Sequence, residues 1–200
     1  MISQLPINRF FNGGKIMQQS SSINPPNKLV LAAVIAAFLA VVGSAYILYY
    51  LGAFSTVVVQ HYQAPSYRIA YVDNTGPYNK IDAVIESVEL DLASKGIEDA
   101  DAIAIFLDDP SVVATDKLRS KVGFIVSDLD PLPGSLEVMT QQSSEVVKAT
   151  FHGSPLVGSY KAYSAMKQWC ADNGYLPSLP GIEIYRNDGT IEYQLAITKK

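Results

Sequence analysis

The feature that most constrains this chain is a long run without charge near its N-terminus, residues 29–51. A helix needs about 20 apolar residues to cross the hydrocarbon core of a bilayer, and this run is long enough. Tyr46, Tyr49 and Tyr50 gather at its end, where aromatic rings suit the boundary between lipid and water. A domain of this size rarely buries so long a helix on all its faces. The run therefore predicts a transmembrane helix.

A cleaved signal peptide is the alternative interpretation of this run. Gly43-Ser44-Ala45 resembles a small-residue cleavage site after an apolar stretch. The apolar sequence continues directly beyond it to Leu51, which favours a helix that is retained. Met17 is a second possible start of the protein, and the sequence leaves that choice open.

The charges on either side of the run predict its orientation. Three basic residues and no acid precede it, whereas Arg68 is the only formally charged residue between the run and Asp73. Basic flanks stay on the cytoplasmic side of a membrane. We therefore expect a single-pass protein with its N-terminus in the cytoplasm and its C-terminal domain outside. Residues 1–28, rich in Asn, Gln, Ser and Pro, are predicted to be a disordered cytoplasmic tail.

The rest of the chain, residues 57–200, is predicted to be one folded, acidic domain. It holds all 19 Asp and Glu but only 12 of the 15 Lys and Arg. An acidic domain without a basic stripe is poorly suited to phosphate backbones, so nucleic acid is not an expected partner. Cys170 is the only cysteine, which excludes an intrachain disulfide and a cysteine-based metal site.

Within this domain the pattern strand, helix, strand, strand occurs twice. Runs rich in Val, Ile and Tyr predict the strands, and apolar residues at helical spacing predict the helices. A strand at 57–62 comes before the first copy. That copy has strands at 67–73, 102–107 and 118–127 and a helix that opens at Thr75-Gly76-Pro77-Tyr78 and ends at Gly96. The second has strands at 146–151, 181–186 and 191–198 and a helix at 157–173. Residues 128–145 are expected to be a polar connector.

The positions of the glycines support the repeat. A shift of 77 to 78 positions places Gly76 on Gly153 and Gly96 on Gly174. Each half supplies a helix that needs a sheet to cover it and a sheet that needs a partner. The predicted fold class is α+β, with duplicated β-α-β-β units forming an antiparallel sheet and two helices around a central cleft, preceded by one transmembrane helix. A cleft between two packed repeats is a natural place for a ligand.

Local motifs in both halves resemble the GyrI-like family, also called AraC-type effector-binding or SOUL-related small-molecule-binding domains. In chain order the motifs are Ala70-Tyr71-Val72, Thr75-Gly76-Pro77-Tyr78, Phe106-Leu107-Asp108-Asp109-Pro110, Leu118-Arg119, Val122-Gly123, His152-Gly153, Lys161-Ala162-Tyr163, Trp169 and Gly181-Ile182-Glu183-Ile184-Tyr185-Arg186-Asn187-Asp188. The resemblance rests on their order and spacing, because each motif alone is common.

The resemblance implies a twofold-repeated domain whose cleft binds small molecules, often flat, apolar and cationic. Members of the family include sensor domains of transcription regulators, stand-alone binders, a gyrase-inhibiting protein and hydrolases of reactive cyclopropane compounds. The acid that the family places in its cleft corresponds to Glu183. The aromatic candidates for the ligand site are Tyr71, Tyr78, Phe106, Tyr163, Trp169 and Tyr185. A second Gly-Pro-Tyr is replaced here by Gly153-Ser154-Pro155-Leu156, so one wall of the cleft lacks its tyrosine.

The expected function is that of a membrane-anchored protein that senses or sequesters a small molecule. Two alternatives stay open. One is a hydrolase of reactive small molecules, in which Glu183 and a cleft tyrosine direct water. The other is a membrane-tethered protein-interaction receptor, similar to a reticulum receptor for autophagy that carries a long disordered tail, a feature not expected after the last strand here. No other catalytic residue, no metal site and no cofactor is expected, because the sequence has no nucleophile elbow, phosphate loop or histidine cluster. Protein partners are not predicted, and the absence of a helix-turn-helix segment argues against a transcription factor.

Overall fold

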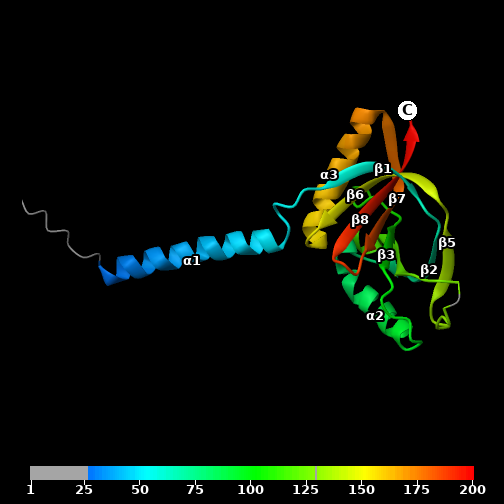
Figure 1. The fold of residues 1–200 in the computed structure, drawn as a ribbon, viewed down its shortest axis with the longest axis horizontal. Coiled ribbons are helices and arrows are strands. Elements are labelled where there is room, and N and C mark those ends of the chain that lie inside the picture. Colours follow the sequence, from blue (N-terminus) through cyan, green and yellow to red (C-terminus); the bar gives the residue numbers. More distant parts are fainter. Residues whose placement is uncertain (1–26, 129) are drawn as a thin grey trace, which may run out of the picture. The chain divides into compact units, whose positions relative to one another are not determined.

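The computed structural model describes residues 27–128 and 130–200 of the chain. Its first element is the helix α1 (Lys28–Tyr50; Figure 1). No residue of α1 is buried. α1 has the length and composition of a membrane-spanning helix, and it lies one residue earlier at each end than the run marked in the sequence. The disordered tail predicted at residues 1–28 lies outside the described residues, except for its last two positions.

Antiparallel strands of the described chain form one eight-stranded sheet (Figure 1). They are β1 (Val58–Ala64), β2 (Tyr67–Thr75), β3 (Ala102–Phe106), β4 (Arg119–Ile125), β5 (Glu137–Gln141), β6 (Ser144–His152), β7 (Tyr175–Tyr185) and β8 (Thr190–Lys199). Their order is β1-β6-β8-β7-β3-β4-β2-β5. β7 and β3 are the central pair, so the two repeats meet in the middle of the sheet.

The repeat expected from the sequence is present. One copy is β2, α2 (Asp82–Ala93), β3 and β4, and the other is β6, α3 (Pro155–Asn173), β7 and β8; the short helices η1 (Tyr78–Lys80) and η2 (Thr115–Lys117) lie in the first. Equivalent glycines have equivalent backbones: φ is 143° at Gly76 and 146° at Gly153, and 75° at both Gly96 and Gly174. Side chains disfavour these φ values, so the same glycine turns shape both halves. The predicted α+β class and duplicated architecture are confirmed.

The polar connector predicted at residues 128–145 is wrong in part. β5 lies within it and pairs with β2 at the edge of the sheet. The sequence of β5, Glu-Val-Met-Thr-Gln, lacks the alternation of apolar and polar side chains that marks a strand, and none of its residues is buried. Pairing with a strand distant in the chain is what makes this segment extended.

The start predicted for β7, at residue 181, is also wrong. The strand begins at Tyr175 and contains Pro177 and Pro180. Proline cannot donate to a central ladder, so prolines are disfavoured within a central strand. Before Gly181, however, β7 pairs with β8 but not with β3, so one side of the strand needs no donors.

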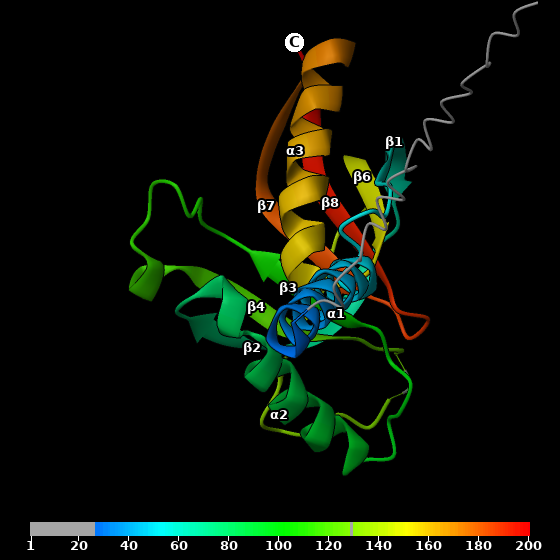
Figure 2. The same cartoon turned by 90° about the vertical axis from the view of Figure 1, so that its left-hand side faces the viewer.

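Both helices of the domain cover the same face of the sheet (Figure 2). α3 packs through Ala162, Met166 and Cys170 onto β6 and β8. α2 packs through Val88 and Leu92 onto β2, β3 and β4. Each repeat therefore has its own helix–sheet core, and the two cores adjoin along the central pair of strands.

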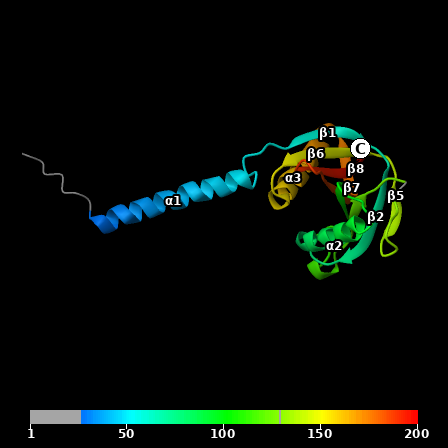
Figure 3. The ribbon, with the colours of Figure 1, turned by 60° about the horizontal axis from the view of Figure 1, so that its bottom comes forward.

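The other face of the sheet is concave, and the strands curve around it (Figure 3). A separate apolar core fills it, with Ile103, Ile105 and Ile184 fully buried. The curvature brings distant strands together, since Gln194 Nε2 on β8 donates to Tyr67 Oη on β2 at 3.3 Å. The sheet thus separates two interiors, one beneath the helices and one enclosed by the strands.

The packing of β4 against β2 predicts a strict requirement for glycine at position 123. A Cβ there would lie 1.9 Å from the Ala70 carbonyl oxygen, a backbone atom that cannot move aside. We expect Gly123→Ala to lower the free energy of unfolding by about 3 kcal/mol or more. A Cβ at Gly134 meets nothing within 4 Å, so Gly134→Ala should change stability by about 0.5 kcal/mol at most. Equal denaturation midpoints for the two variants would contradict this strand packing.

Candidate functional site

Glu183 lies at the junction of the two repeats, on the central strand β7. It pairs with Ala104 of β3 on one side and with Tyr193 of β8 on the other. Side chains alternate along a strand, so Glu183 shares the helix-covered face with Gly181 and Tyr185. It is 4% exposed, which makes it a carboxylate inside the protein between the cores of α2 and α3.

Hydroxyl groups surround this carboxylate. The Tyr185 hydroxyl donates to Oε2 at 2.8 Å, and the Ser159 hydroxyl donates to Oε1 at 3.3 Å. The Tyr163 hydroxyl is a third donor to the same group. Among the described residues, no lysine, arginine or histidine forms an ion pair with Glu183. Its negative charge is therefore hydrogen-bonded but not neutralised.

Two glycines make room for the tyrosines of the site. A Cβ at Gly181 would lie 2.8 Å from the Tyr163 hydroxyl oxygen. The absence of a side chain at Gly181 therefore lets the Tyr163 ring lie over β7 and reach Glu183. On α3, a Cβ at Gly158 would lie 2.3 Å from the hydroxyl oxygen of Tyr193. Tyr163 and Tyr193 then meet edge to face, with their ring centroids 5.8 Å apart.

Burial changes the ionisation of the site. Desolvation raises the pKa of Glu183 from 4.5 to about 7, although hydrogen bonds from Tyr185, Tyr163 and Ser159 oppose the change. Burial, and then the charge of Glu183, raise the pKa of the Tyr163 and Tyr185 hydroxyls. The tyrosines therefore remain donors, while Glu183 exchanges its proton near neutral pH.

Five of the seven residues predicted for the site lie together. Glu183, Tyr163 and Tyr185 are in direct contact. Phe106 pairs with Gly181 in the sheet and packs in the same small core as Tyr185. The Tyr78 ring lies 4.4 Å from that of Phe106, centroid to centroid, and its hydroxyl donates to the Arg119 carbonyl oxygen at 2.9 Å. Tyr78 thus forms the end of the site nearest α2.

The remaining two predicted residues lie elsewhere. Tyr71 is on the opposite face of the sheet, where its hydroxyl donates to Glu137 Oε2 at 2.8 Å and Lys121 Nζ lies 4.2 Å from its ring centroid. Trp169, on the second half of α3, stacks on His61 and Tyr175. Neither residue has a contact with Glu183 in the described structure.

Sequence reasoning missed two members of the site, Ser159 and Tyr193. A signal for each was present. Ser159 lies one helical turn before Tyr163, so both fall on the same side of α3. Glu183 lies four residues before the turn at 187–189 and Tyr193 four residues after it, so the two residues pair across the hairpin of β7 and β8.

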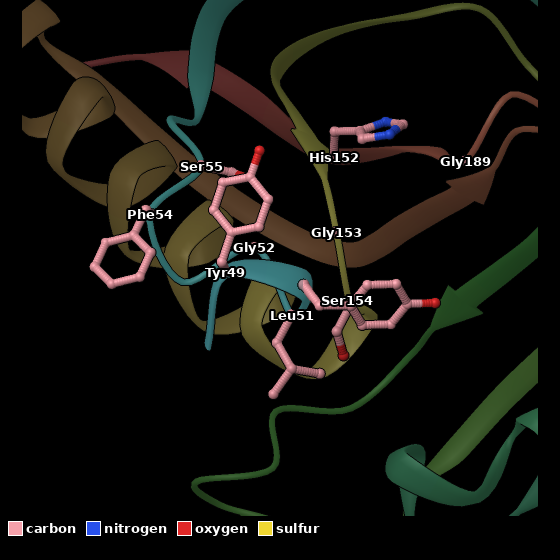
Figure 4. Close-up of a pocket in the computed structure, with 10 residues that line it drawn as sticks. Tyr49, Leu51, Gly52, Phe54, Ser55, His152, Gly153, Ser154 and Gly189 are labelled. Atoms are coloured by element: carbon pink, nitrogen blue, oxygen red, sulfur yellow. The ribbon is translucent and has the colours of Figure 1, made fainter. Parts of the chain in front are cut away.

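A hollow of about 560 Å³ lies apart from Glu183 (Figure 4). The end of α1, the segment after it and the turn between β6 and α3 line this hollow. Its lining residues are Tyr49, Tyr50, Leu51, Gly52, Phe54, Ser55, His152, Gly153, Ser154 and Gly189. Among the residues that the structure describes, no three His, Cys, Asp or Glu side chains cluster as metal ligands.

The comparisons with known proteins agree on the fold. The family model of the GyrI-like small molecule binding domain matches residues 59–198. No curated protein sequence matches the chain. The crystal structure of the EcmrR C-terminal domain has a TM-score of 0.59 at 17% identity, covering 72% of this chain and 99% of that one.

Two further structures show the same likeness. EcmrR in a complex with DNA has a TM-score of 0.58 at 14% identity, covering 86% of this chain and 70% of that one. An integron cassette protein from the mobile metagenome of Vibrio cholerae has a TM-score of 0.53 at 11% identity, covering 72% and 100%. At these identities the likeness concerns the fold alone.

The raised pKa of Glu183 predicts that the domain loses stability as the pH rises. In the unfolded chain Glu183 ionises from pH 4.5 upward, whereas in the folded chain it keeps its proton to about pH 7. The unfolded state then binds fewer protons, so the free energy of unfolding falls across this window. The loss should be on the order of 3 kcal/mol for such a shift.

Glu183→Gln should abolish this part of the pH dependence. Denaturant unfolding of both proteins from pH 4 to 8 checks it, because other titrating groups cancel in the difference between them. The substituted protein should gain stability relative to the original as pH rises. A difference that is constant over the range would show that Glu183 is not desolvated.

Proposed function

The chain belongs to the GyrI-like family of small-molecule-binding domains, and we propose that it binds flat, apolar, cationic molecules at Glu183 while α1 anchors it in a membrane. The observation that carries the ligand class is a buried carboxylate with hydroxyl donors but no cationic partner. An unpaired buried charge is unfavourable. A bound cation would supply the missing charge.

The surrounding rings suit such a ligand. Tyr163, Tyr185, Tyr78 and Phe106 surround the region between the carboxylate and α2. Aromatic faces attract cations and cover apolar surface at the same time. Because Glu183 is 4% exposed and Tyr163 and Tyr185 are half-buried above it, a ligand would reach the carboxylate by displacing these two rings.

Hydrolysis of a reactive small molecule is the second candidate function. It is favoured by one observation, the pKa of Glu183 near 7. A general base works best when its pKa is close to the operating pH, and Tyr163 or Tyr185 could donate a proton to a leaving group. A hydrolase would consume an alkylating compound, whereas a binding protein would return it intact.

We propose that the anchor holds the domain on the extracytoplasmic side. Arg9 and Lys15 precede α1 and Lys28 is its first residue, while the segment that follows the helix has no formal charge before Arg68. This asymmetry supports a cytoplasmic N-terminus. The acidic surface expected on the domain also supports a small-molecule role in place of nucleic-acid binding, although one structural neighbour was solved with DNA.

The ligand proposal predicts a charge preference that depends on Glu183. N-methylacridinium and acridine differ by one methyl group and by charge at mildly alkaline pH. We expect the protein to prefer the cation, and Glu183→Gln to weaken its binding by about 1–3 kcal/mol with little effect on acridine. Calorimetric titration of protein in lipid nanodiscs, with empty nanodiscs as the blank, measures both. Affinity for the cation should also fall below about pH 7, as Glu183 takes up a proton.

Glu137→Gln is the matched control for this experiment. Glu137 also accepts a hydrogen bond from a tyrosine, but on the opposite face of the sheet, so its substitution should leave both affinities unchanged. If Glu183→Gln binds the cation as tightly as the original protein, the ligand site lies elsewhere. Loss of an alkylating ligand over time would favour the hydrolase.

The topology proposal predicts the activity of a reporter fusion. Alkaline phosphatase folds only outside the cytoplasm, so in bacterial cells a fusion after Lys200 should be active and should remain with the membranes at full length. An inactive fusion would reverse the orientation. A soluble mature protein that begins near Tyr46 would show that α1 is a cleaved signal.

A further inference from the structure

The segment that follows α1 is fastened to the first turns of α3. Leu51 comes directly after the helix, and its carbonyl oxygen accepts a hydrogen bond from the backbone N–H of Ser154 at 3.1 Å. Two residues further on, the Lys161 ammonium donates to the carbonyl oxygens of Ala53 at 2.6 Å and Ser55 at 2.7 Å. The N-terminal end of α3 is therefore held within one residue of the end of α1.

Close packing of two glycines makes this attachment possible. Gly52 has φ of 77°, and a Cβ there would lie 2.8 Å from the Phe151 ring and 3.0 Å from the His152 carbonyl oxygen. A Cβ at Gly153 would lie 3.0 Å from the Gly52 Cα. The two backbones are in direct contact, with no side chain between them, so the attachment requires glycine at both positions.

The exposed stripe of α3 changes its chemistry along the helix. Leu156 is 77% exposed and Tyr160, one turn later, is 81% exposed. Beyond them the exposed residues of α3 are Ser164, Lys167, Gln168, Ala171, Asp172 and Asn173. Large apolar side chains therefore face outward only at the end of α3 that is fastened to the membrane helix. Phe54, in the fastened segment, is 70% exposed as well.

We infer that the N-terminal end of α3, with Phe54, Leu156 and Tyr160, rests in the headgroup layer of the bilayer that α1 crosses. This rests on the proposed function, since α1 must span a membrane. A helix of 23 residues is roughly 35 Å long, which slightly exceeds a hydrocarbon core of about 30 Å. Residues attached directly after Tyr50 then lie at the level of the headgroups, where Tyr, Phe and Leu are favourable.

If this end of α3 lies at the bilayer surface, the ligand can come from the bilayer. Ser159 and Tyr163, which donate to Glu183, flank Tyr160 on the same two turns of α3. A molecule that reaches Glu183 past this part of the helix starts from the lipid surface. Amphiphilic cations concentrate at that surface, so the site would draw on molecules dissolved in the bilayer.

Tryptophan quenching in vesicles tests the inference. Full-length protein with Trp169→Phe receives one new tryptophan, by Tyr160→Trp or, as the matched control on the same stripe, by Ala171→Trp. Each variant is reconstituted into phosphatidylcholine vesicles with or without brominated acyl chains. The brominated lipid should remove most of the emission of the Tyr160→Trp variant and little of that of the Ala171→Trp variant.

The outcomes separate this inference from the proposed function. Protein that floats with the vesicles but shows unquenched Tyr160→Trp emission overturns the surface contact alone. Equal quenching at both positions overturns it too, because α3 would then lie along the membrane. A blue-shifted but unquenched emission would assign the stripe to contact between protein copies. Protein that fails to float overturns the anchor and the surface contact together, and N-methylacridinium binding, measured separately, remains the test of the Glu183 site.

Discussion

The constraint that shapes the centre of this structure is the need to hydrogen-bond a polar side chain, Glu183, that is buried where the two repeats meet. Glu183 occupies the middle of the sheet, between the helix–sheet cores of α2 and α3. An apolar residue at this position would merge the two cores into one. A carboxylate instead requires donors, and both strand and helix supply them, through Tyr185 and through Ser159 and Tyr163. The junction is thus the least apolar part of the helix-covered interior.

This arrangement explains why a duplicated fold carries one asymmetric site. The glycine turns and the helix positions repeat closely in the two halves. The hydroxyl of Tyr78, the tyrosine after the first turn, accepts from the Asp108 backbone N–H, just after β3, and donates to the carbonyl oxygen of Arg119, the first residue of β4. The second half has Leu156 near the corresponding place, and its side chain faces outward. The wall that lacks a tyrosine thus carries an exposed apolar side chain, on the first turn of α3, next to the Ser154 backbone N–H that donates to the Leu51 carbonyl oxygen.

α3 links three parts of the molecule through three of its sides. Met166 and Cys170 lie in the core beneath it, Ser159 and Tyr163 reach Glu183, and Lys161 holds the segment that follows α1. Helical spacing is what allows neighbours in sequence to take such different roles. A ligand that displaces Tyr163 would therefore act on the same helix turns that hold the segment after α1.

The sequence by itself determined the elements that depend on local chemistry. The uncharged apolar run was sufficient for α1. The helical spacing of apolar residues, the matching glycines and the runs rich in Val, Ile and Tyr were sufficient for α2, α3 and the duplicated order of strands. β5 was not predicted because its residues show no alternation of apolar and polar side chains. The first residues of β7 were not predicted because they are extended by pairing with β8 alone, which only the tertiary structure shows.

For the site, the sequence identified Glu183 and four of the aromatic residues around it, but only the tertiary structure decided which tyrosines share its face. Tyr71 and Glu183 lie on different strands, and the pairing between strands sets on which side of the sheet each side chain emerges. The protonation of Glu183 near neutral pH was likewise beyond the sequence, because desolvation comes from residues brought together by folding. Local patterns fix which segments form, whereas strand register and burial fix what those segments can bind.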